Sequence, residues 1–320
     1  MRTTRRVIIG SHYAGGGPRV NYNGRAVSFP LTVLVDGALT GVLYAPVALA
    51  FVIVYRASGV INFALGEWTM LGAAFTAAGL LVPGLGLMAS LLAACLAMIA
   101  LGLAVNRVVF TPLAGRPVLA FVMVTLGLGA FVRGAGALAF SGVPRRLPSP
   151  LPAEPLAVGG VLIASDKLAA AAVAVVAAAA ATWFFRQSRT GLALRAIADD
   201  QQIALSMGID VHRHFALTWG VVGVLSVVAG ALWTFVTGGG FGVILLGLKV
   251  FPIVIVGGLD SIPGALVGAV LVGVLESLTA AYLGPSLGGG VSTVASSLVL
   301  IAVLFARPHG LFGRPRVARA

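Results

Sequence analysis

The sequence predicts an all-α integral membrane protein, a polytopic bundle of about eight transmembrane helices. Two properties of its 320 residues point to this class. Hydrophobic residues make up 59% and charged residues 9% of the chain, and its mean hydropathy is +1.06, whereas soluble domains carry about 25% charged residues. Apolar stretches also recur from Leu31 to Ala306, and several approach the roughly 20 residues that cross a bilayer. Lipid offers no hydrogen-bond partners to the backbone, so these stretches are expected to be helices.

The apolar stretches divide the chain into two tails and a membrane domain, 31–306. Residues 1–30 are expected to form a polar tail, since they lack the apolar core of a signal peptide. Residues 307–320 are expected to form a basic cytoplasmic tail. The predicted membrane segments are 31–54, 58–82, 87–110, 117–140, 166–185, 214–237, 243–258, 264–283 and 291–306. Between them, the proline-rich interval 141–165 is predicted to be an external loop, and 186–213 a cytoplasmic loop.

Arginines indicate which loops face the cytoplasm. Cytoplasmic loops of membrane proteins carry an excess of lysine and arginine. Such residues gather in the interval 186–213 and after the last apolar run: Arg186, Arg189, Arg195, Arg213, Arg307, Arg314, Arg316 and Arg319. The net charge of +12 therefore reports topology, and no nucleic-acid partner is expected.

The arginines of the N-terminal tail conflict with a simple count of crossings. Four full spans before 141 would place this tail outside, although its arginines favour the cytoplasm. A broken or re-entrant segment between 31 and 82 would resolve the conflict. The sequence Tyr55-Arg56-Ala57-Ser58-Gly59 interrupts the apolar pattern there. Irregular backbone at membrane depth is tolerated where it lines a cavity.

Four residues beyond this interruption are candidates for a solute pathway: Asn62, Phe63, Gly66 and Glu67. A carboxylate inside an apolar run costs a few kcal/mol unless it is paired or faces water. Near a glycine-assisted helix break, polar side chains and freed backbone groups can meet a polar solute. The alternative is that Asn62 and Glu67 cap a helix or bond across helices without touching solute.

Three further charges lie in apolar surroundings. Asp36 and Lys249 are near the ends of their runs and are expected to snorkel toward the interface. Glu276 lies deeper and is expected to pair within the bundle. Small-residue pairs, Gly37 with Gly41 and Gly264 with Gly268, are spaced for close helix packing within the subunit, with a subunit interface as the alternative.

The stretch 191–208 predicts a short amphipathic helix at the membrane face. Arg195, Asp199, Gln202 and Ser206 recur at helical spacing and form one polar stripe. Ala204 and Gly208 are small enough for another protein to approach closely, and Asp199 and Asp200 offer it negative charge. An ordinary interfacial helix is the alternative.

Signals for other chemistry are weak. Cys95 is the single cysteine, and of the four histidines three lie outside the apolar runs and His214 is the first residue of one, which argues against a disulfide framework or a buried metal site. The pattern Gly-x-Ser-x-Gly around Ser286 lacks its strand–turn–helix context. No phosphate-binding Gly-x-x-x-x-Gly-Lys-Ser/Thr motif occurs, so the chain is not expected to bind ATP or another cofactor.

Four stretches in order resemble the branched-chain amino acid permeases of ABC importers, of the LivH type. They are GVLYAPVALAFVIVYRASGVINFALGEWTMLGAAF (41–75), RTGLALRAIADDQQIALSMGIDV (189–211), GLKVFPIVIVGGLDSIPGALVGAVLVGVLESLTAAYL (247–283) and RPHGLFG (307–313). Leu65 departs from the family, which commonly has a histidine there. The resemblance implies transport of branched-chain amino acids first, with urea, short amides and other small carboxylates open.

The resemblance also implies partners in a bacterial inner membrane. A periplasmic solute-binding protein would deliver solute, a second permease subunit of the LivM type would complete the pathway, and two cytoplasmic ATPase subunits would bind ATP and Mg²⁺. The helix 191–208 would seat in an ATPase cleft through these residues: Gly191, Arg195, Asp199, Asp200, Ala204 and Gly208.

Two other functions compete with the permease hypothesis. A self-contained secondary transporter would need its own coupling-ion site, and few midplane carboxylates exist beyond Glu67 and Glu276. An intramembrane serine protease using Ser286 would need a membrane-embedded histidine to activate it, and the sequence offers none.

Overall fold

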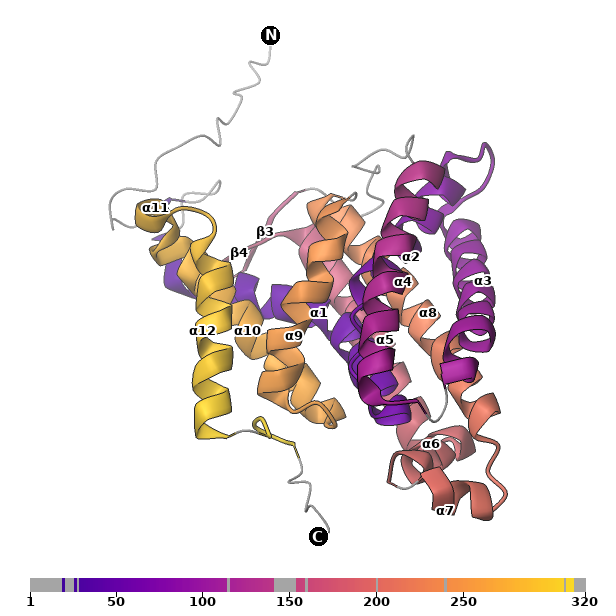
Figure 1. The fold of residues 1–320 in the computed structure, drawn as a ribbon. Coiled ribbons are helices and arrows are strands. Elements are labelled where there is room, and N and C mark those ends of the chain that lie inside the picture. Colours follow the sequence, from indigo (N-terminus) through magenta and orange to yellow (C-terminus); the bar gives the residue numbers. More distant parts are fainter. Residues whose placement is uncertain are drawn as a thin grey trace.

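The protein is a bundle of helices with two small hairpins (Figure 1). The computed structural model describes residues 19–20, 26–27, 29–113, 116–140, 154–158, 161–199, 201–238, 241–307 and 309–313. The longer helices are α1 (Phe29–Ser58), α2 (Leu65–Leu81), α3 (Leu87–Val105), α4 (Val118–Ala139), α5 (Ser165–Gln187), α8 (Val211–Thr237), α9 (Leu245–Gly257), α10 (Ile262–Tyr282) and α12 (Val291–Ala306).

Short elements connect these helices. They are η1 (Asn106–Phe110), a π-helix, η2 (Thr111–Leu113), α6 (Arg189–Asp199), α7 (Gln201–Ser206), η3 (Phe241–Ile244) and α11 (Gly284–Leu287). Two antiparallel hairpins pair β1 (Arg19–Val20) with β2 (Ala26–Val27) and β3 (Leu156–Val158) with β4 (Val161–Ile163). The second hairpin occupies part of the interval expected to be an external loop, whose residues 141–153 and 159–160 lie outside the described ranges.

The prediction of an all-α membrane bundle is confirmed. Among the described residues, six helical segments are long and apolar enough to span a membrane, and they contain α1, α3, α4, α5, α8 and α10. The shorter helices α2, α9 and α12 have 17, 13 and 16 residues. Nine helices thus account for the nine apolar runs of the sequence.

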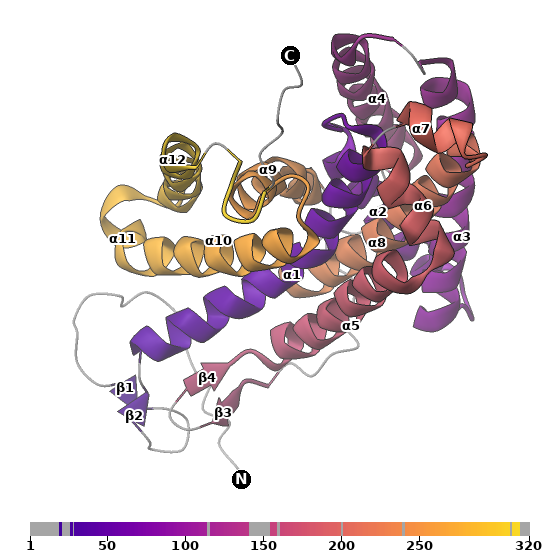
Figure 2. The ribbon, with the colours of Figure 1, turned by 90° about the horizontal axis from the view of Figure 1, so that it is seen from below.

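Helix α1 forms the centre of the bundle. Figure 2 shows it running diagonally across the molecule, with α10 along one side and α5 and α8 along the other. Every residue from Leu43 to Val54 is buried. Its 30 residues correspond to about 45 Å at 1.5 Å per residue, and this length exceeds the hydrocarbon thickness of about 30 Å.

Glycines allow the closest helix contacts. A methyl group at Gly41 would lie 2.5 Å from Cα of Val270, and one at Gly37 would lie 2.7 Å from Cα of Val274, both on α10. Gly264 and Gly268 in turn pack against the backbone of α9. Both small-residue pairs therefore pack helices within the subunit, as the first interpretation had it.

The two ends of the bundle differ. Phe29, at the start of α1, packs edge-on against Tyr282 at 5.7 Å, and α1 also contacts β4. We call this the hairpin end. The helices α6 and α7 and the C-terminal segment lie at the opposite end, which we call the α6–α7 end (Figure 1). Arg56, near the end of α1, borders a cleft there together with Asp199.

This arrangement corrects the expected topology. The N-terminal tail was expected on the same side as 186–213, but α1 begins at the hairpin end and crosses the whole bundle. The predicted break exists and lies after α1 rather than within it: Gly59 has φ of +69°, and residues 59–64 are not helical. The break separates α1, which crosses the bundle, from the 17-residue helix α2, and it does not abolish the crossing of α1.

Candidate functional site

The segment between α1 and α2 lies at depth in the bundle. Glu67, in the first turn of α2, packs beside Gly129 and Arg133 in the middle part of α4. Helix α2 therefore begins beside the middle of α4. Non-helical backbone at such depth has to find its hydrogen bonds inside the protein. Asn62 supplies one of them, since its Oδ1 accepts a hydrogen bond of 2.9 Å from the backbone N–H of Ala64.

The other half of the Asn62 amide has no partner. Asn62 is 4% exposed, and its Nδ2 is buried without a hydrogen bond within the described part of the chain. Asn62 lines a cavity of about 270 Å³. Its other walls are the C-terminal end of α1, the first turns of α4 and α8, and the π-helix η1. We call it the Asn62 cavity. Of the four predicted pathway residues, only Asn62 borders it.

Phe63 and Gly66 join the break to α9. The Phe63 ring stacks on Phe251 with centroids 5.0 Å apart, and its backbone N–H donates to Thr125 Oγ1 at 3.4 Å. A methyl group at Gly66 would lie 2.6 Å from the carbonyl oxygen of Ile244 and 3.0 Å from Cα of Gly247. Helices α2 and α9 consequently touch backbone to backbone at this point.

Glu67 forms an ion pair with Arg133 of α4, a partner that the sequence analysis missed. The Glu67 side chain is 6% exposed and that of Arg133 is 53% exposed. The pair compensates a carboxylate that burial alone would penalise. Arg133 is the single charged residue in the apolar run 117–140, and that isolation is the signal that could have identified it.

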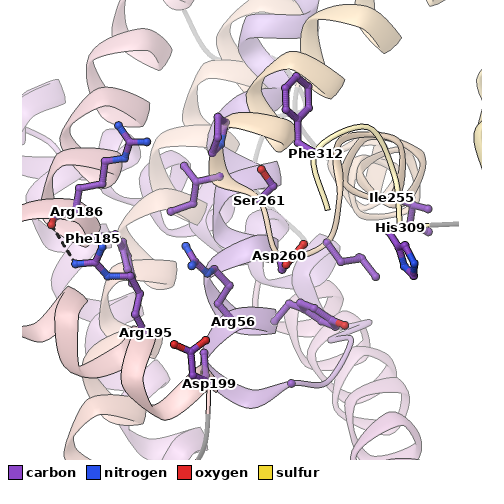
Figure 3. Close-up of a pocket in the computed structure, with 16 residues that line it drawn as sticks. Arg56, Phe185, Arg186, Arg195, Asp199, Ile255, Asp260, Ser261, His309 and Phe312 are labelled. Atoms are coloured by element: carbon purple, nitrogen blue, oxygen red, sulfur yellow. Dashed lines mark hydrogen bonds between the residues drawn. The ribbon is translucent and has the colours of Figure 1, made fainter. Parts of the chain in front are cut away.

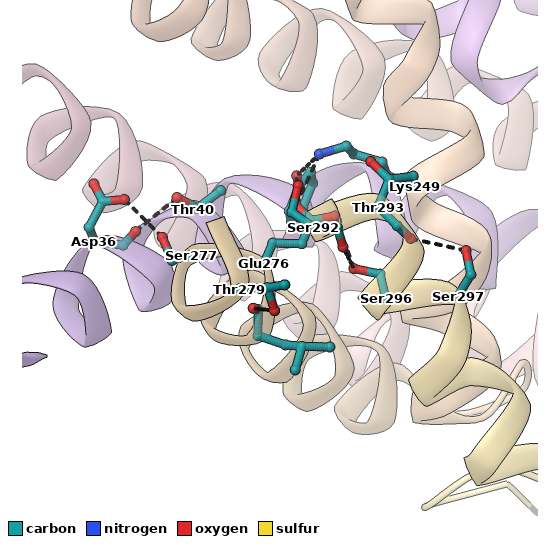
Figure 4. Close-up of polar contacts among 12 residues, drawn as sticks. Asp36, Thr40, Lys249, Glu276, Ser277, Thr279, Ser292, Thr293, Ser296 and Ser297 are labelled. Carbon is teal, nitrogen blue, oxygen red and sulfur yellow. Dashed lines mark hydrogen bonds and ion pairs between the residues drawn. The ribbon is translucent and has the colours of Figure 1, made fainter. Parts of the chain in front are cut away.

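A second buried carboxylate joins four helices (Figure 4). Glu276 Oε2 of α10 accepts hydrogen bonds from Tyr44 of α1 at 2.7 Å and from Lys249 of α9 at 3.0 Å. Its Oε1 accepts one from Ser296 of α12 at 3.2 Å. The prediction that Glu276 pairs within the bundle is confirmed. The expectation that Lys249 snorkels is wrong, because its ammonium turns inward to Glu276 and Tyr44.

Asp36 is also held by partners from other helices. Its Oδ1 pairs with Lys167 of α5, and its Oδ2 accepts a hydrogen bond of 3.0 Å from Ser277 of α10 (Figure 4). The Asp36 side chain is 45% exposed, which agrees with its expected position near the interface, and it is also paired there. Near the hairpin end, Asp36 ties α1 to α5 and α10.

The stretch 191–208, predicted to be one amphipathic helix, contains most of α6, which ends at Asp199, and all of α7, which begins at Gln201. A Cβ at Gly191 would collide with the carbonyl group of Phe185, so the glycine permits the sharp corner from α5 into α6. Arg195 braces this corner, since its guanidinium donates to the carbonyl oxygens of Arg186 at 3.2 Å and Gly191 at 3.3 Å.

Of the other predicted coupling residues that the structure describes, Ala204 is placed differently from the expectation, whereas Asp199 and Gly208 are exposed. Ala204 is 2% exposed and packs into the protein, so it does not offer a surface to another chain. Gly208 is exposed, and its φ of +79° shows that the turn after α7 requires it. Asp199 is exposed, and Asp200 lies outside the described residues. Ile203 and Met207, which are 61% and 77% exposed, are large apolar side chains that the sequence analysis did not single out as a surface.

A cleft of about 900 Å³ opens at the α6–α7 end (Figure 3). The side chains of Arg56, Asp199 and Asp260 gather around it from α1, α6 and the turn between α9 and α10. The C-terminal segment closes one side, because the backbone N–H groups of Leu311 and Phe312 donate to carbonyls at the end of α9, at 2.8 and 3.1 Å. The cleft thus connects the predicted coupling region to α9.

Comparison with known proteins assigns the chain to a family. A family model described as "Branched-chain amino acid transport system / permease component" matches residues 33–307. The chain belongs to this family. The predicted function class is confirmed by this match, which includes the α1–α2 break, both buried carboxylates and the α6–α7 region.

Relatives of this permease family match it along nearly their whole length. The high-affinity branched-chain amino acid transport system permease protein BraD of Pseudomonas aeruginosa is 33% identical, and the alignment covers 90% of this chain and 97% of that protein. LivH of Escherichia coli is 31% identical with the same coverage. Among solved structures, PsaBC from Streptococcus pneumoniae in complex with Fab has a TM-score of 0.47 and 15% identity over 88% of this chain.

Membership of this permease family disfavours the two rival functions. The relatives are named as permease components of transport systems and not as self-contained carriers. Ser286 lies on the short helix α11, where its hydroxyl donates to the carbonyl oxygen of Leu283 at 3.0 Å.

Proposed function

We propose that the chain is a permease subunit of an ATP-driven importer that carries branched-chain amino acids across a bacterial inner membrane. The observation that carries this proposal is the family match over 33–307, together with relatives whose names state branched-chain amino acid transport. The partners would be a second permease subunit, two cytoplasmic ATPase subunits and a periplasmic solute-binding protein. ATP and Mg²⁺ would bind to the ATPase subunits and no cofactor to this chain.

The solute pathway in this proposal passes the α1–α2 break. In support of this, Asn62, Phe63, Gly66 and Glu67 are close in sequence inside the bundle, Asn62 borders the Asn62 cavity, and Glu67 pairs with Arg133. Glycine at position 66 and the stacked Phe63 and Phe251 rings bring α9 against this segment. A movement of α9 would therefore displace the residues of the break.

Coupling to ATP hydrolysis is proposed to pass through α6 and α7. The sequence has no phosphate-binding loop, so ATP dependence has to enter by contact with another protein. Ile203 and Met207 expose apolar surface at the α6–α7 end, and Asp199 places a charge beside it. Exposed large apolar residues on a polar surface are typical of docking sites. A displacement of α6 on ATPase binding would reach α9 through the residues that line the cleft and through the C-terminal segment, which is hydrogen-bonded to the end of α9.

The docking surface can be tested by placing charge on it. Ile203→Asp combined with Met207→Asp should release the ATPase subunits, because an unpaired charge in an apolar interface costs several kcal/mol. Co-purification of the ATPases with the tagged permease measures this, and we expect at least a tenfold loss, which corresponds to about 1.4 kcal/mol.

The matched control is Val158→Asp at the hairpin end, where Val158 is 61% exposed. This variant should retain its ATPases. Undiminished co-purification of the ATPases with the Ile203→Asp, Met207→Asp variant would show that α7 is not the coupling surface.

A further inference from the structure

The Asn62 amide is fixed in an orientation that leaves a donor unused. Its Oδ1 accepts a hydrogen bond of 2.9 Å from the backbone N–H of Ala64. Because the amide group is planar, this bond also fixes the position of Nδ2. Asn62 is 4% exposed and borders the cavity, and its Nδ2 has no acceptor in the described part of the chain. Buried polar groups are normally hydrogen-bonded. Asn62, a lining residue of this cavity, therefore has a donor for which the described part of the chain supplies no acceptor.

The charge around the cavity is positive. Arg116, which is exposed, belongs to its lining, and no carboxylate pairs with Arg116 among the described residues. None of the fifteen described lining residues is an aspartate or glutamate. A guanidinium and an amide donor at one site favour an anion, since charge-assisted hydrogen bonds to carboxylates are among the strongest in proteins.

The hydroxyl groups in the lining already donate hydrogen bonds to backbone carbonyl oxygens. Thr218 donates to the carbonyl of His214 at 2.9 Å, Thr125 to that of Val122 at 3.0 Å, and Ser58 to a carbonyl of its own helix at 2.8 Å. The amides of Asn62 and Asn106 and the guanidinium of Arg116 are among the donors that remain for a ligand.

The rest of the lining is apolar and aromatic. Phe110 stacks on Trp219 with centroids 4.6 Å apart, and Val54 and Ile61 add aliphatic surface. The volume of about 270 Å³ lies just below the roughly 300 to 1,000 Å³ of pockets for drug-sized ligands, so it suits a smaller molecule. Part of the wall is the π-helix η1, and such bulges occur frequently at functional sites.

We propose that the Asn62 cavity binds the carboxylate end of a small solute with a short branched apolar chain. The carboxylate accepts hydrogen bonds from Asn62 and Arg116, and the hydrocarbon lies against Phe110 and Trp219. This places a solute site inside one permease subunit. The inference rests on the proposed function for the choice of solute, and on the cavity alone for the chemistry of the ligand.

Equilibrium binding to the full-length chain in lipid nanodiscs tests the site without the ATPase partners. Radiolabelled leucine is the probe, with two competitors. Isocaproate keeps the carboxylate and the branched chain, and isopentylamine keeps the chain but carries an ammonium group instead. We expect leucine to bind, isocaproate to displace it, and isopentylamine to fail.

Two variants and a control locate the binding. Asn62→Asp keeps the size of the side chain and its acceptor for Ala64 but replaces the donor, and Arg116→Gln removes the exposed charge. Each should weaken leucine binding about tenfold or more, the loss expected for one charge-assisted bond. Arg107→Gln changes an exposed arginine outside the cavity lining and should bind as the unaltered chain does.

Three results would overturn the proposal: isopentylamine competing as well as isocaproate, unchanged leucine affinity in both cavity variants, or no binding of either carboxylate. The last would mean that the cavity holds only water. Failure of the proposed function looks different. In that case carboxylate binding is intact and sensitive to Asn62 and Arg116, while ATP-driven uptake is missing.

Discussion

Two buried carboxylates, Glu67 and Glu276, each pair with a cation from a different helix. Both belong to apolar runs, and removing one partner of a buried pair typically costs about 3–5 kcal/mol. The cations are partly exposed, 53% for the Arg133 side chain and 31% for that of Lys249, so solvent or another protein reduces this figure. Among the described residues, Glu276 has three hydrogen-bonding partners, whereas Glu67 has one, Arg133. Glu276 is therefore the more structural residue of the two.

Glu67 can be tested separately from its ion pair. Glu67→Gln combined with Arg133→Gln removes both charges, so no unpaired charge remains and the protein should reach the membrane at its normal level. If Glu67 lines the pathway, leucine uptake in cells should still fall about tenfold or more, the loss expected for one hydrogen bond to a charged group.

The control for this double variant is Glu154→Gln, which neutralises an exposed glutamate before β3. Its uptake should be unaffected. Normal uptake by the double variant, at normal protein level, would leave Glu67 with a purely structural role.

At the scale of elements, the sequence predicted where helices exist better than how they meet. The interruption at Tyr55–Gly59 correctly located the end of α1, because a run of polar and small residues breaks the apolar pattern there. The pairing of Glu67 with Arg133 and of Lys249 with Glu276 could not be predicted, since it depends on which helices become neighbours. The division of 191–208 into α6 and α7 was missed because one polar stripe fits both arrangements.

The contact between α2 and α9 predicts a steric effect at Gly66. Gly66→Val should separate the two helices, because the added atoms would overlap the backbone of Ile244 and Gly247. Overpacking of this kind costs about 1–3 kcal/mol. The loss of stability is measured as a lower thermal unfolding temperature of the purified protein, with size-exclusion chromatography as the method that monitors unfolding.

Gly127→Val is the matched control on α4, since a Cβ at Gly127 meets nothing within 4 Å. It should unfold at the same temperature as the unaltered protein. Equal stability of the Gly66 variant would contradict the close α2–α9 contact.

At the scale of the whole molecule, the sequence predicted the class of protein but not the side on which α1 begins. Composition and apolar runs are sufficient for a membrane bundle. The position of the N-terminal arginines argued for the α6–α7 side, whereas the crossing of α1 puts Phe29 beside Tyr282 at the hairpin end. The charge of the N-terminal tail therefore constrains the side on which α1 begins less than the long buried crossing of α1 does.

Cysteine accessibility in intact cells checks this arrangement. In a Cys95→Ser background, Leu31→Cys near the start of α1 and Met207→Cys after α7 should lie on opposite sides of the membrane. Both positions are exposed, at 46% and 77%. We expect an impermeant thiol reagent to label Leu31→Cys from outside and Met207→Cys only after the cells are opened. Labelling of both from the same side would refute the full crossing of α1.

The most direct test of the central claim is leucine uptake into proteoliposomes. The permease would be reconstituted with its co-purified subunits, with ATP supplied on the ATPase side and the solute-binding protein on the other. We predict uptake that requires ATP and the binding protein together and stops when either is left out. Uptake by the purified chain alone, driven by an ion gradient and indifferent to ATP, would contradict a permease subunit of an ATP-driven importer.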